Sequence, residues 1–354
     1  RKQKQRISDI MNIYFYPPPR NNERKVVNNP YCQEFINSLS ADFNINKKSK
    51  FSVDILDLFF SSFKNDVVIL NWIENVAIKR FAIIQFFIAV CIFIILRVRN
   101  VKVIWIMHNI FPHKGRNILV KLMLNLLYNQ SDIIITHSRQ AEVFLRDNKA
   151  IKGEIIFSHH PINDSLINNN KSESRRINKE SKKYDAIIWG TIEPYKGILE
   201  FLMFYSSTKR INIDKMLIIG RCKNESYFQE LLKYCPNNIE IHNRKVDFSE
   251  LSVLIEDSKC VLFPYKSGSI SSSGALMDTI ALGGVAIGPD VGAFKDLEKE
   301  GVCKTFSDYS EISSLIENIE DIKPDNLSNF IKNNTWKNFG DHISMRIKRI
   351  CTNK

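Results

Sequence analysis

Residues 263–287 read FPYKSGSISSSGALMDTIALGGVAI, and their pattern indicates the class of fold. An apolar run ends at Phe263, a loop rich in serine and glycine follows, and a helical pattern covers residues 275–282. Gly283 and Gly284 then lead into another short apolar run. Two strand-length apolar runs joined by one helix predict a β-α-β unit with parallel strands.

The same alternation of short apolar runs and helical stretches continues along the whole chain. The runs are apolar throughout, which is typical of strands covered by helices on both faces. The repeated order predicts an α/β protein with parallel, doubly wound sheets. The predicted strands are Asn12–Tyr16, Lys50–Val53, Val67–Leu70, Val101–Met107, Ile133–Thr136, Glu154–Phe157, Ala186–Trp189, Met216–Ile219, Ile239–Ile241, Cys260–Phe263, Val285–Ile287 and Val302–Thr305.

Residues 168–183, NNNKSESRRINKESKK, interrupt this alternation, and only one of them is apolar. Such a composition does not build a core and predicts a linker or a solvated loop. A chain of 354 residues is long enough for two domains. We therefore expect two tandem Rossmann-like domains, over residues 11–168 and 185–330, joined by residues 169–184. Ligands of such sheets bind beyond the carboxyl ends of the strands, so a cleft between the domains is the expected ligand site.

The net charge of +12 is concentrated in the first half of the chain. Residues 1–170 carry 23 Lys and Arg against 13 Asp and Glu, whereas residues 171–354 carry 27 against 25. A basic surface attracts anionic lipids, phosphates or nucleic acid. No nucleic-acid-binding motif accompanies the charge, so we expect no nucleic acid partner. An anionic membrane surface or a lipid-diphosphate substrate is the favoured partner, with an ordinary solvated surface as the simpler alternative.

The most apolar segment is residues 81–96, FAIIQFFIAVCIFIIL, which lies between Lys79-Arg80 and Arg97. As a helix it would span about 24 Å, less than the ~30 Å hydrocarbon core of a bilayer. Two interpretations stay open. The helix is either buried between a sheet and a neighbouring element, or it also dips into the membrane interface with the help of its flanking cations.

The seven cysteines are scattered and form no Cys-x-x-Cys pair. The sequence therefore predicts neither a disulfide framework nor a zinc site, which fits a reducing compartment. Residues 1–10 are polar and basic and have no signal-peptide pattern, and we expect them to be a leader outside the fold. The expected location is the cytoplasm, peripheral to the inner face of the cell membrane.

Two clusters at predicted strand ends in the second half suit a diphosphate ligand. Gly190 ends one strand, and Lys196-Gly197 then opens a helix whose free N–H groups and positive dipole end attract anions. In the other cluster, Ser271-Ser272-Ser273 before a helix supplies hydroxyl and N–H donors. Each cluster alone is also typical of an ordinary surface turn. Their shared position at the carboxyl ends of one predicted sheet favours a binding site.

These clusters lie in segments that resemble a known enzyme family. PYKSGSISSSGALMDTIALGGVAIGPDVGAF (264–294) resembles the donor loop of GT-B glycosyltransferases related to glycosyltransferase family 4, of the type that builds bacterial exopolysaccharide or O-antigen. WGTIEPYKG (189–197) resembles the phosphate-binding segment of that family. The resemblance implies a nucleotide-sugar donor site in the second domain. The implied donor contacts are Gly190, Lys196, Gly197, Arg221, Tyr265, Ser271, Ser272, Ser273, Gly274 and Asp278.

The sequence departs from the family pattern at two points. Many members carry Glu-x7-Glu in the donor loop, where the second carboxylate holds the ribose and the first supports the sugar. Here the second position is Asp278 and the first is Ile270, which leaves the sugar and the stereochemistry open. The usual Arg before the Lys-Gly pair is also absent, and Arg221 is the candidate that replaces it.

The first half carries the implied acceptor site and reaction centre. WIMHNIFPHKG (105–115) resembles the loop of glycogen-synthase-like GT-B enzymes in which a histidine touches the donor sugar, and this implies a catalytic role for His108 and a second one for His113. Taken alone, each histidine is also typical of a structural hydrogen bond. NNPYCQEFINSL (28–39) and LNWIEN (70–75) resemble acceptor-facing segments. The implied acceptor contacts are Arg20, Tyr31, Asn71, Trp72 and Asn109.

NNTWKNFGDHI (333–343) resembles the closing helix of GT-B enzymes, so residues 331–354 are expected to pack back on the first domain. The expected reaction moves a sugar from a UDP- or GDP-sugar to a saccharide acceptor, linked to a polyprenyl diphosphate, in bacterial surface polysaccharide synthesis. The sequence contains no Asp-x-Asp, so we expect no metal and no resident cofactor. Lys196 and helix N-termini would then stabilise the leaving diphosphate.

Two alternatives stay open, a GT-B-fold nucleotide-sugar epimerase and a non-catalytic scaffold for polysaccharide assembly. The sequence also leaves open whether the reaction retains or inverts the sugar configuration. Inversion needs a general base, for which His108, His113 and His137 are the candidates.

Overall fold

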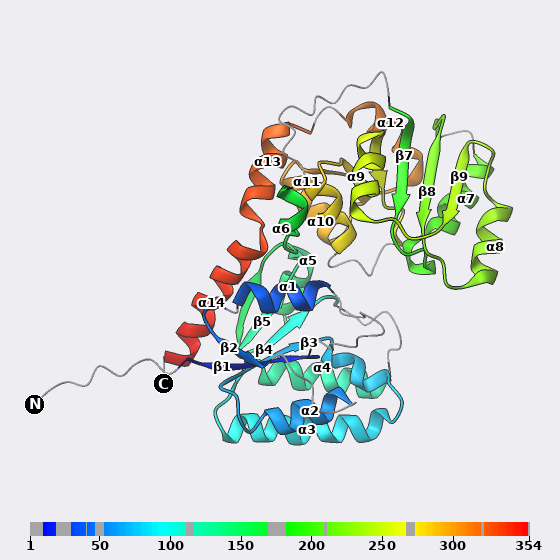
Figure 1. Ribbon diagram of the computed structural model, residues 1–354. Helices are drawn as coiled ribbons and strands as arrows, with labels where there is room; N and C mark the ends of the chain where they lie inside the picture. Colours follow the sequence, from blue (N-terminus) through cyan, green and yellow to red (C-terminus); the bar gives the residue numbers. More distant parts are fainter. Residues whose placement is uncertain are drawn as a thin grey trace, which may run out of the picture. The chain divides into compact units, whose positions relative to one another are not determined.

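The computed structural model describes residues 10–18, 30–39, 41–46, 53–110, 117–168, 182–208, 211–266, 273–319 and 322–352. The chain divides into two compact units, one made of residues 1–159 and 336–354 and the other of residues 160–335. Each unit contains a six-stranded sheet in which every strand pairing is parallel (Figure 1). The prediction of two Rossmann-like domains with parallel sheets is therefore confirmed.

The first unit has the strand order β2-β1-β3-β4-β5-β6. Its strands are β1 (Asn12–Tyr16), β2 (Asn44–Asn46), β3 (Val67–Asn71), β4 (Lys102–Met107), β5 (Ile133–Thr136) and β6 (Glu154–Phe157). Its helices are α1 (Pro30–Leu39), α2 (Asp54–Ser61), the 3-10 helix η1 (Ile73–Ile78), α3 (Ala82–Val98), α4 (Ile118–Gln130), α5 (Arg139–Arg146) and α14 (Trp336–Thr352).

Two hydrophobic cores cover the two faces of this sheet. In β4, Val103, Trp105 and Met107 point into the core shared with α2, α3 and α4, whereas Ile104 and Ile106 point into the core shared with α1 and α14. This alternation follows from the two-residue period of a strand. Because both faces are covered, the strand is apolar along its whole length, as the sequence predicts.

The C-terminal helix α14 belongs to the first unit, although it follows the second unit in the chain. Trp336 packs edge-on against Tyr31 of α1, with 5.1 Å between the ring centroids. Arg346 and Arg349 of α14 both pair with Glu154 at the start of β6. The prediction that the last helix returns to the first domain is confirmed.

The second unit has the strand order β12-β11-β10-β7-β8-β9. Its strands are β7 (Tyr184–Trp189), β8 (Met216–Gly220), β9 (Ile239–Asn243), β10 (Ser258–Leu262), β11 (Ala286–Pro289) and β12 (Cys303–Phe306). Its helices are α6 (Asp164–Asn168), η3 (Pro194–Lys196), α7 (Ile198–Ser207), α8 (Glu225–Lys233), α9 (Phe248–Glu256), α10 (Gly274–Ala281), α11 (Gly292–Lys299), η4 (Tyr309–Glu311), α12 (Ile312–Glu317) and α13 (Pro324–Asn333).

Helices also cover both faces of the second sheet. One core joins the sheet to α9, α10 and α11, and the other joins it to α7, α8 and α12. In β8, Leu217 and Ile219 enter the first of these cores, and Met216 and Ile218 enter the second. The carboxyl ends of all six strands lie at one edge, where their loops form the candidate ligand site.

The first sheet departs from the sequence prediction in one strand. The predicted strand Lys50–Val53 is not part of it, because Val53 is the residue that precedes α2, and residues 50–52 lie outside the described ranges. The edge strand is instead β2, the short polar segment Asn-Ile-Asn, which pairs with β1. A three-residue polar strand has no apolar run to mark it in the sequence.

Helix α3 is the helix predicted over residues 81–96, and it is covered on one face only. Ala89, Ile92, Phe93 and Leu96 are buried in the core, whereas other apolar residues of the helix are exposed. Within the described ranges, no helix is both long enough and apolar enough to cross a membrane.

Candidate functional site

Glycines shape the carboxyl edge of the second sheet where β7 and β8 end. Gly190 follows β7 with a φ of +99°, a backbone conformation that glycine adopts without strain. A Cβ atom on Gly220, at the end of β8, would lie 1.7 Å from the carbonyl oxygen of Gly190. The loops after β7 and β8 therefore approach each other closely, and only glycine fits at both positions.

Lys196 lies in this edge and is 4 % exposed. Its Nζ atom is 2.8 Å from the position of a Cβ atom on Gly190, so the ammonium group lies over the glycine backbone. Burial lowers the pKa of Lys196, and the nearby Tyr195 and Glu193 oppose this shift. Among the described residues no carboxylate pairs with it within 4.0 Å. A buried ammonium group without a carboxylate partner is a site for an anion from outside the protein.

The two clusters predicted from the sequence meet at this edge. Gly197 has a φ of +67°, and a Cβ atom there would lie 2.0 Å from the carbonyl oxygen of Pro264. The backbone N–H of Lys266 donates to the carbonyl of Tyr195, and the Lys196 Nζ atom lies 5.6 Å from the centroid of the Tyr265 ring. The segment after β7 and the loop after β10 thus form one surface, although they are about seventy residues apart.

Ser273 is the N-cap of helix α10, and its side chain accepts a hydrogen bond from the backbone N–H of Leu276. Tyr265 contacts the Ser273 side chain, and burial raises the pKa of Tyr265 to about 12, so its phenol is neutral near pH 7. Gly274 is the exposed first residue of α10. The other predicted serines, Ser271 and Ser272, lie outside the described residues, as does Ile270.

Asp278 lies one turn into α10 and is partly buried. Burial raises the pKa of its carboxyl group to about 7, and no hydrogen bond or ion pair to this carboxyl group is formed by the described residues. Near neutral pH the group therefore exists in both protonation states. A partly buried carboxyl group that has no protein partner is available to a ligand hydroxyl.

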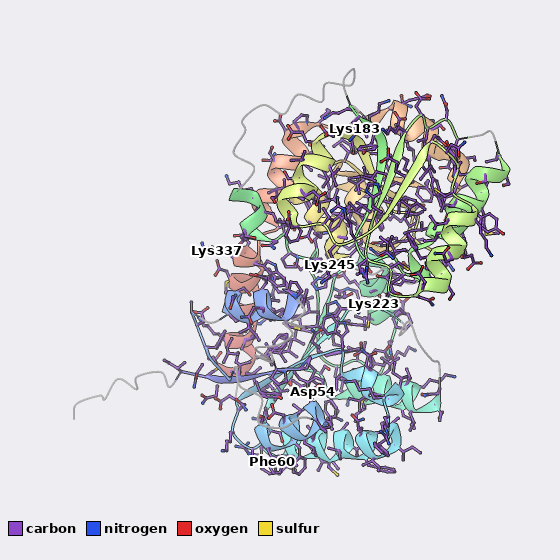
Figure 2. All side chains as sticks on the ribbon, turned by 45° about the vertical axis from the view of Figure 1, so that its right-hand side comes forward. Asp54, Phe60, Lys183, Lys223, Lys245 and Lys337 are labelled. Carbon is purple, nitrogen blue, oxygen red and sulfur yellow. The ribbon has the colours of Figure 1, made fainter. Side chains whose placement is uncertain are left out.

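Other cations gather at the same edge, and of these the sequence predicts only Arg221 as a ligand contact. Arg221, the predicted replacement for the missing family Arg, is exposed just after β8, and its backbone carbonyl accepts from the N–H of Ile192. Lys223 follows it, and Lys245 lies after β9; both are exposed at the loops of this edge (Figure 2). A cavity of about 450 Å³ extends the edge past β10, β11 and β12, lined by Tyr265 and Lys266 among others.

His160 is a further residue near the start of α10 that the sequence does not predict. Its Nδ1 atom lies 2.9 Å from the carbonyl oxygen of Pro161, and a carbonyl only accepts, so Nδ1 carries the proton. Burial lowers the pKa of His160 to about 4, which leaves the ring neutral and its Nε2 atom an acceptor. That Nε2 atom lies 4.0 Å from the position of a Cβ atom on Gly274, at the start of α10. The two residues are 114 positions apart in the sequence, so no local sequence pattern predicts their contact.

The first unit has its own cluster of polar groups at the carboxyl edge of its sheet. Asn71 ends β3, His108 follows β4 and His137 follows β5, while Tyr31 reaches them from α1. All four are at least nine-tenths buried. The His108 and His137 ring centroids are 5.7 Å apart, and the Tyr31 ring lies edge-on to both.

Hydrogen bonds fix the protonation of both histidines. His137 Nδ1 lies 2.8 Å from the carbonyl oxygen of Ser158, so Nδ1 donates and Nε2 accepts the hydroxyl proton of Tyr31 at 2.7 Å. Burial raises the pKa of Tyr31 well above its ordinary value, which keeps that proton on the phenol. His108 Nε2 lies 2.6 Å from Asn71 Oδ1, and Asn71 Nδ2 donates to Cys32 Sγ. In its neutral form His108 therefore donates from Nε2 and has its lone pair on Nδ1.

Trp72 covers His108. It has a φ of +53°, in the left-handed region that a bulky residue rarely adopts. The Trp72 and His108 rings stack with centroids 4.8 Å apart and an angle of 23° between their planes. Backbone strain of this kind concentrates at functional sites, where the surrounding structure maintains it.

The structure separates the predicted acceptor contacts into two groups. Tyr31 and Asn71 are buried, and their polar atoms bind His137, His108 and Cys32 within the unit. Trp72 and Asn109 are partly exposed. Arg20 and His113 lie outside the described residues.

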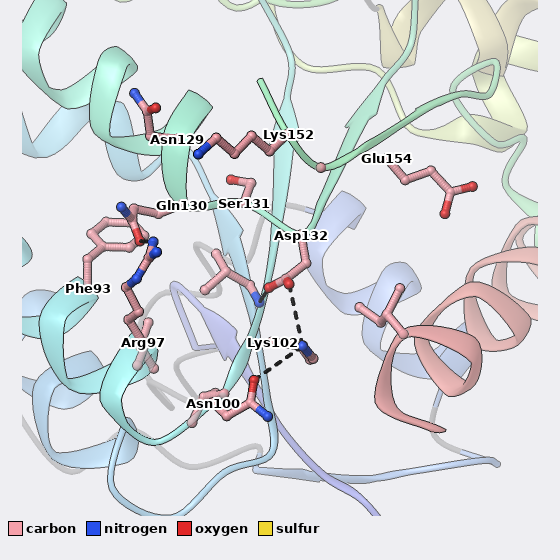
Figure 3. Close-up of a pocket in the computed structure, with 15 residues that line it drawn as sticks. Phe93, Arg97, Asn100, Lys102, Asn129, Gln130, Ser131, Asp132, Lys152 and Glu154 are labelled. Carbon is pink, nitrogen blue, oxygen red and sulfur yellow. Dashed lines mark hydrogen bonds and ion pairs between the residues drawn. The ribbon is translucent and has the colours of Figure 1, made fainter. Parts of the chain in front are cut away.

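A cavity of about 580 Å³ lies at the opposite edge of the first sheet, next to the first residues of β4, β5 and β6 (Figure 3). The polar groups that line it include Lys102 and Asp132, which pair with each other at 3.7 Å. Asp132 also accepts the backbone N–H of Val103. None of the predicted site residues lines this cavity. Ligands of parallel α/β sheets bind at the carboxyl ends of the strands, so the candidate site is the other edge.

No known family model matches the chain, and no curated protein matches its sequence. Solved structures do match it along most of its length. Anabaena HepE, solved in complex with UDP, is similar with a TM-score of 0.67 and 9% identity over 96% of this chain and 100% of that one. Sucrose-phosphate synthase from Thermosynechococcus elongatus has a TM-score of 0.66 and 9% identity over 96% and 99% of the two chains.

An α,α-trehalose-phosphate synthase (UDP-forming) from Burkholderia vietnamiensis has a TM-score of 0.61 and 9% identity over 98% of this chain and 99% of that one. At such low identity the similarity establishes the fold alone. The chain therefore has the GT-B fold, with two Rossmann-like domains in tandem.

Proposed function

We propose that this protein is a glycosyltransferase that moves a sugar from a nucleoside-diphosphate sugar to a saccharide acceptor. The observation that carries the proposal is the buried ammonium group of Lys196, which lies over Gly190 at the carboxyl edge of the second sheet. Such a group needs an anion, and a diphosphate fits between an ammonium group and a helix N-terminus. The resemblance of residues 189–197 and 264–294 to the donor segments of GT-B enzymes supports the same assignment.

In this proposal the second domain, residues 185–330, binds the donor. Lys196 and the N-terminus of α10 contact the diphosphate, together with the exposed cation Arg221 and the serines at positions 271–273. Asp278 accepts a hydrogen bond from a ribose hydroxyl in its ionised form. The similar structures include HepE in complex with UDP-glucose, which makes UDP-glucose the first donor to test.

The reaction breaks the bond between the anomeric carbon and the diphosphate oxygen, and a new bond forms to the acceptor oxygen. Negative charge develops on the leaving diphosphate, and a fixed cation in a site sheltered from water stabilises it. The acceptor hydroxyl loses its proton, either to the leaving phosphate in a retaining reaction or to a protein base in an inverting one. We propose that this chemistry needs no metal ion.

We assign the acceptor and the reaction centre to the first domain, residues 11–168. His108 is the proposed catalytic residue, and His113 the second candidate. Asn71 and Tyr31 are proposed to position the two histidines, because their polar atoms already bind His108 and His137. Trp72 and Asn109 are partly exposed and are the proposed acceptor contacts, together with Arg20.

We further propose that the acceptor is linked to a polyprenyl diphosphate and that the enzyme acts at an anionic membrane surface, in the synthesis of a bacterial surface polysaccharide. The basic first half supports this location, since it carries most of the net charge of +12. The resemblance to enzymes of glycosyltransferase family 4 that build exopolysaccharide or O-antigen supports the class of acceptor.

One experiment separates this proposal from its alternatives. The protein is incubated with UDP- and GDP-sugars, with and without polyprenyl-diphosphate-linked saccharides, and both free nucleotide and sugar products are measured. Nucleotide release that depends on the acceptor supports glycosyl transfer. An epimerised nucleotide sugar without acceptor would instead identify an epimerase, and the absence of nucleotide binding would favour a scaffold.

A further inference from the structure

Helix α3 exposes a continuous apolar stripe on its outer face. The exposed members of the stripe follow the spacing of one helix face: Ile84, Phe87, Cys91, Ile94 and Val98. Phe87 is 64 % exposed and Ile94 58 % exposed. Residues spaced by three and four positions lie on one side of a helix, so these side chains form a single strip about 20 Å long.

The neighbouring helices widen this strip. Helix α2 and the turn after it expose Phe60 and Phe63, and helix α4 exposes Ile118 and Leu122. Both helices pack beside α3 on the side of the sheet opposite α1 and α14 (Figure 1). Phe60 lies at the outer edge of this layer (Figure 2). Scattered single apolar residues are normal on a surface, but exposed apolar side chains on three neighbouring helices indicate a binding surface.

The charged residues of helices α3 and α4, and of the turns next to α3, are all basic. Between Glu74 and Asp132 the sequence contains eight Lys and Arg and no Asp or Glu. Arg80 lies before the start of α3, Arg97 and Arg99 lie at its end, and Lys121 lies on α4, all exposed. The acidic residues of α2 do not offset them, because Asp57 is buried against the hydroxyl of Tyr14 and Asp54 lies 4.0 Å from the Lys79 ammonium group.

An apolar centre with a cationic rim matches an anionic lipid surface. Apolar side chains enter the region between head groups and acyl chains, while Lys and Arg bind anionic head groups at the edge. A second copy of this chain is the less suitable occupant. A two-fold pairing of this face would bring the Arg80, Arg97 and Arg99 groups of two copies together, with no acidic residue between Glu74 and Asp132 to neutralise them.

We propose that the α2–α3–α4 face of the first unit binds the surface of an anionic lipid bilayer, with Phe87 and Ile94 as central apolar anchors and Arg80, Arg97, Arg99 and Lys121 as its cationic rim. Helix α3 lies in the plane of the interface and does not cross it. The inference deepens the membrane association included in the proposed function and rests on it, because it names the surface that would make the contact.

The test is co-sedimentation of the full chain with vesicles of phosphatidylcholine alone and of phosphatidylcholine mixed with phosphatidylglycerol. We expect binding to the mixed vesicles that weakens with added salt. Phe87→Glu and Ile94→Glu should each weaken it about tenfold or more, because a charge replaces an apolar anchor in the interface. A double variant with Arg80→Gln and Lys121→Gln should bind the mixed vesicles more weakly than the unchanged protein does. Its binding to vesicles of phosphatidylcholine alone should not change.

Matched controls introduce the same charge at equally exposed apolar positions on other surfaces. Val253→Glu on α9 and Met345→Glu on α14 replace side chains that are 57 % and 63 % exposed, and they should bind vesicles as the unchanged protein does. Thermal unfolding confirms that each variant is folded. All positions are exposed, so loss of binding does not arise from a disrupted core.

The outcomes distinguish the two levels of the proposal. Failure of the unchanged protein to bind either vesicle would overturn both the membrane association and this surface. Equal binding by the unchanged protein and the α3 variants would overturn the surface alone. A dimer that dissociates in Phe87→Glu, with unchanged vesicle binding, would identify the face as an interface between copies. Release of nucleotide with a water-soluble acceptor tests glycosyl transfer independently of these three vesicle-binding outcomes.

Discussion

The Nζ atom of Lys196 lies 2.8 Å from the position that a Cβ atom on Gly190 would occupy. The glycine is therefore part of the lysine's site, because any side chain there would displace the ammonium group. The two residues come from the end of β7 and from η3, and together they form a cationic site at the carboxyl edge of the sheet. Five predictions follow from this cationic site, from Asp278 of α10 and from the histidine cluster of the first unit.

Lys196→Met should lower kcat/KM by about 10²–10³, the effect of removing one preorganised charge from a developing anion. Its stability should equal or exceed that of the unchanged protein, since an apolar chain replaces a buried ammonium group that pairs with no carboxylate of the described residues. Initial rates of nucleotide release and thermal unfolding measure the two effects. Lys295→Met is the control, because Lys295 is exposed and pairs with Asp290. It should change neither the rate of nucleotide release nor the thermal stability by much.

The lowered pKa of Lys196 also predicts the direction of a pH effect. Between the folded pKa and the higher unfolded pKa, the unfolded chain binds more protons, so stability rises as pH increases through this window. Lys196→Met should lack this rise. The free energy of unfolding of the unchanged protein and of Lys196→Met is measured in urea at a series of alkaline pH values. If the two free energies changed with pH in parallel, the burial of a charged Lys196 would be contradicted.

Gly190→Ala should weaken nucleotide binding strongly, because it strains a backbone φ of +99° and pushes the Lys196 ammonium group away. Gly301→Ala is a matched control. Gly301 also has a positive φ, +71°, and a Cβ atom there would lie 2.5 Å from the side chain of Asn326. Both variants should lose roughly 1–2 kcal/mol of stability from the backbone strain. Calorimetric titration with UDP and GDP should show a loss of affinity for Gly190→Ala only.

The Asp278 carboxyl group has a pKa of about 7, raised by burial. If its ionised form holds the ribose, nucleotide affinity should increase as pH rises through that value. The stability of the free protein should move in the opposite direction, falling as pH rises from the ordinary Asp pKa to about 7, because the folded state binds more protons there. Asp278→Asn should flatten both profiles. A pH-independent affinity in the unchanged protein would exclude this role for Asp278.

His108→Ala should lower kcat by about 10²–10⁴, the contribution of a positioned acid or base, with little change in donor affinity. Asn71→Leu should lower kcat less, since it keeps His108 and removes the amide that orients its ring. His242→Ala, on an exposed residue of β9, is the control. If His108→Ala and His242→Ala were equally active, the proposed reaction centre would be wrong.

The sequence predicts most of the fold because the strands are apolar on both faces. Eleven of the twelve predicted strands correspond to strands of the structure, with ends that differ by at most two residues. The turns at Gly190 and Gly197 can also be predicted from the sequence, since a strand end followed by glycine predicts a tight turn. The polar strand β2 was missed because three residues carry no periodic signal.

Contacts between distant residues account for what the sequence does not predict. The Tyr31 and His137 pair joins positions 106 residues apart, and His160 reaches the start of α10 across a similar distance. The exposed face of α3 was also not predictable. A helix that is apolar all round has no hydrophobic periodicity, so only the packed structure shows which of its residues remain uncovered.

The decisive measurement is the release of nucleotide from UDP- and GDP-sugars, with and without a saccharide acceptor. It is made in EDTA for the unchanged protein and for Lys196→Met. We predict release that requires a saccharide acceptor, persists in the chelator and falls by about two orders of magnitude in the variant. Release that ceases in EDTA, or equal rates for the two proteins, would contradict a metal-independent glycosyl transfer that depends on the buried Lys196.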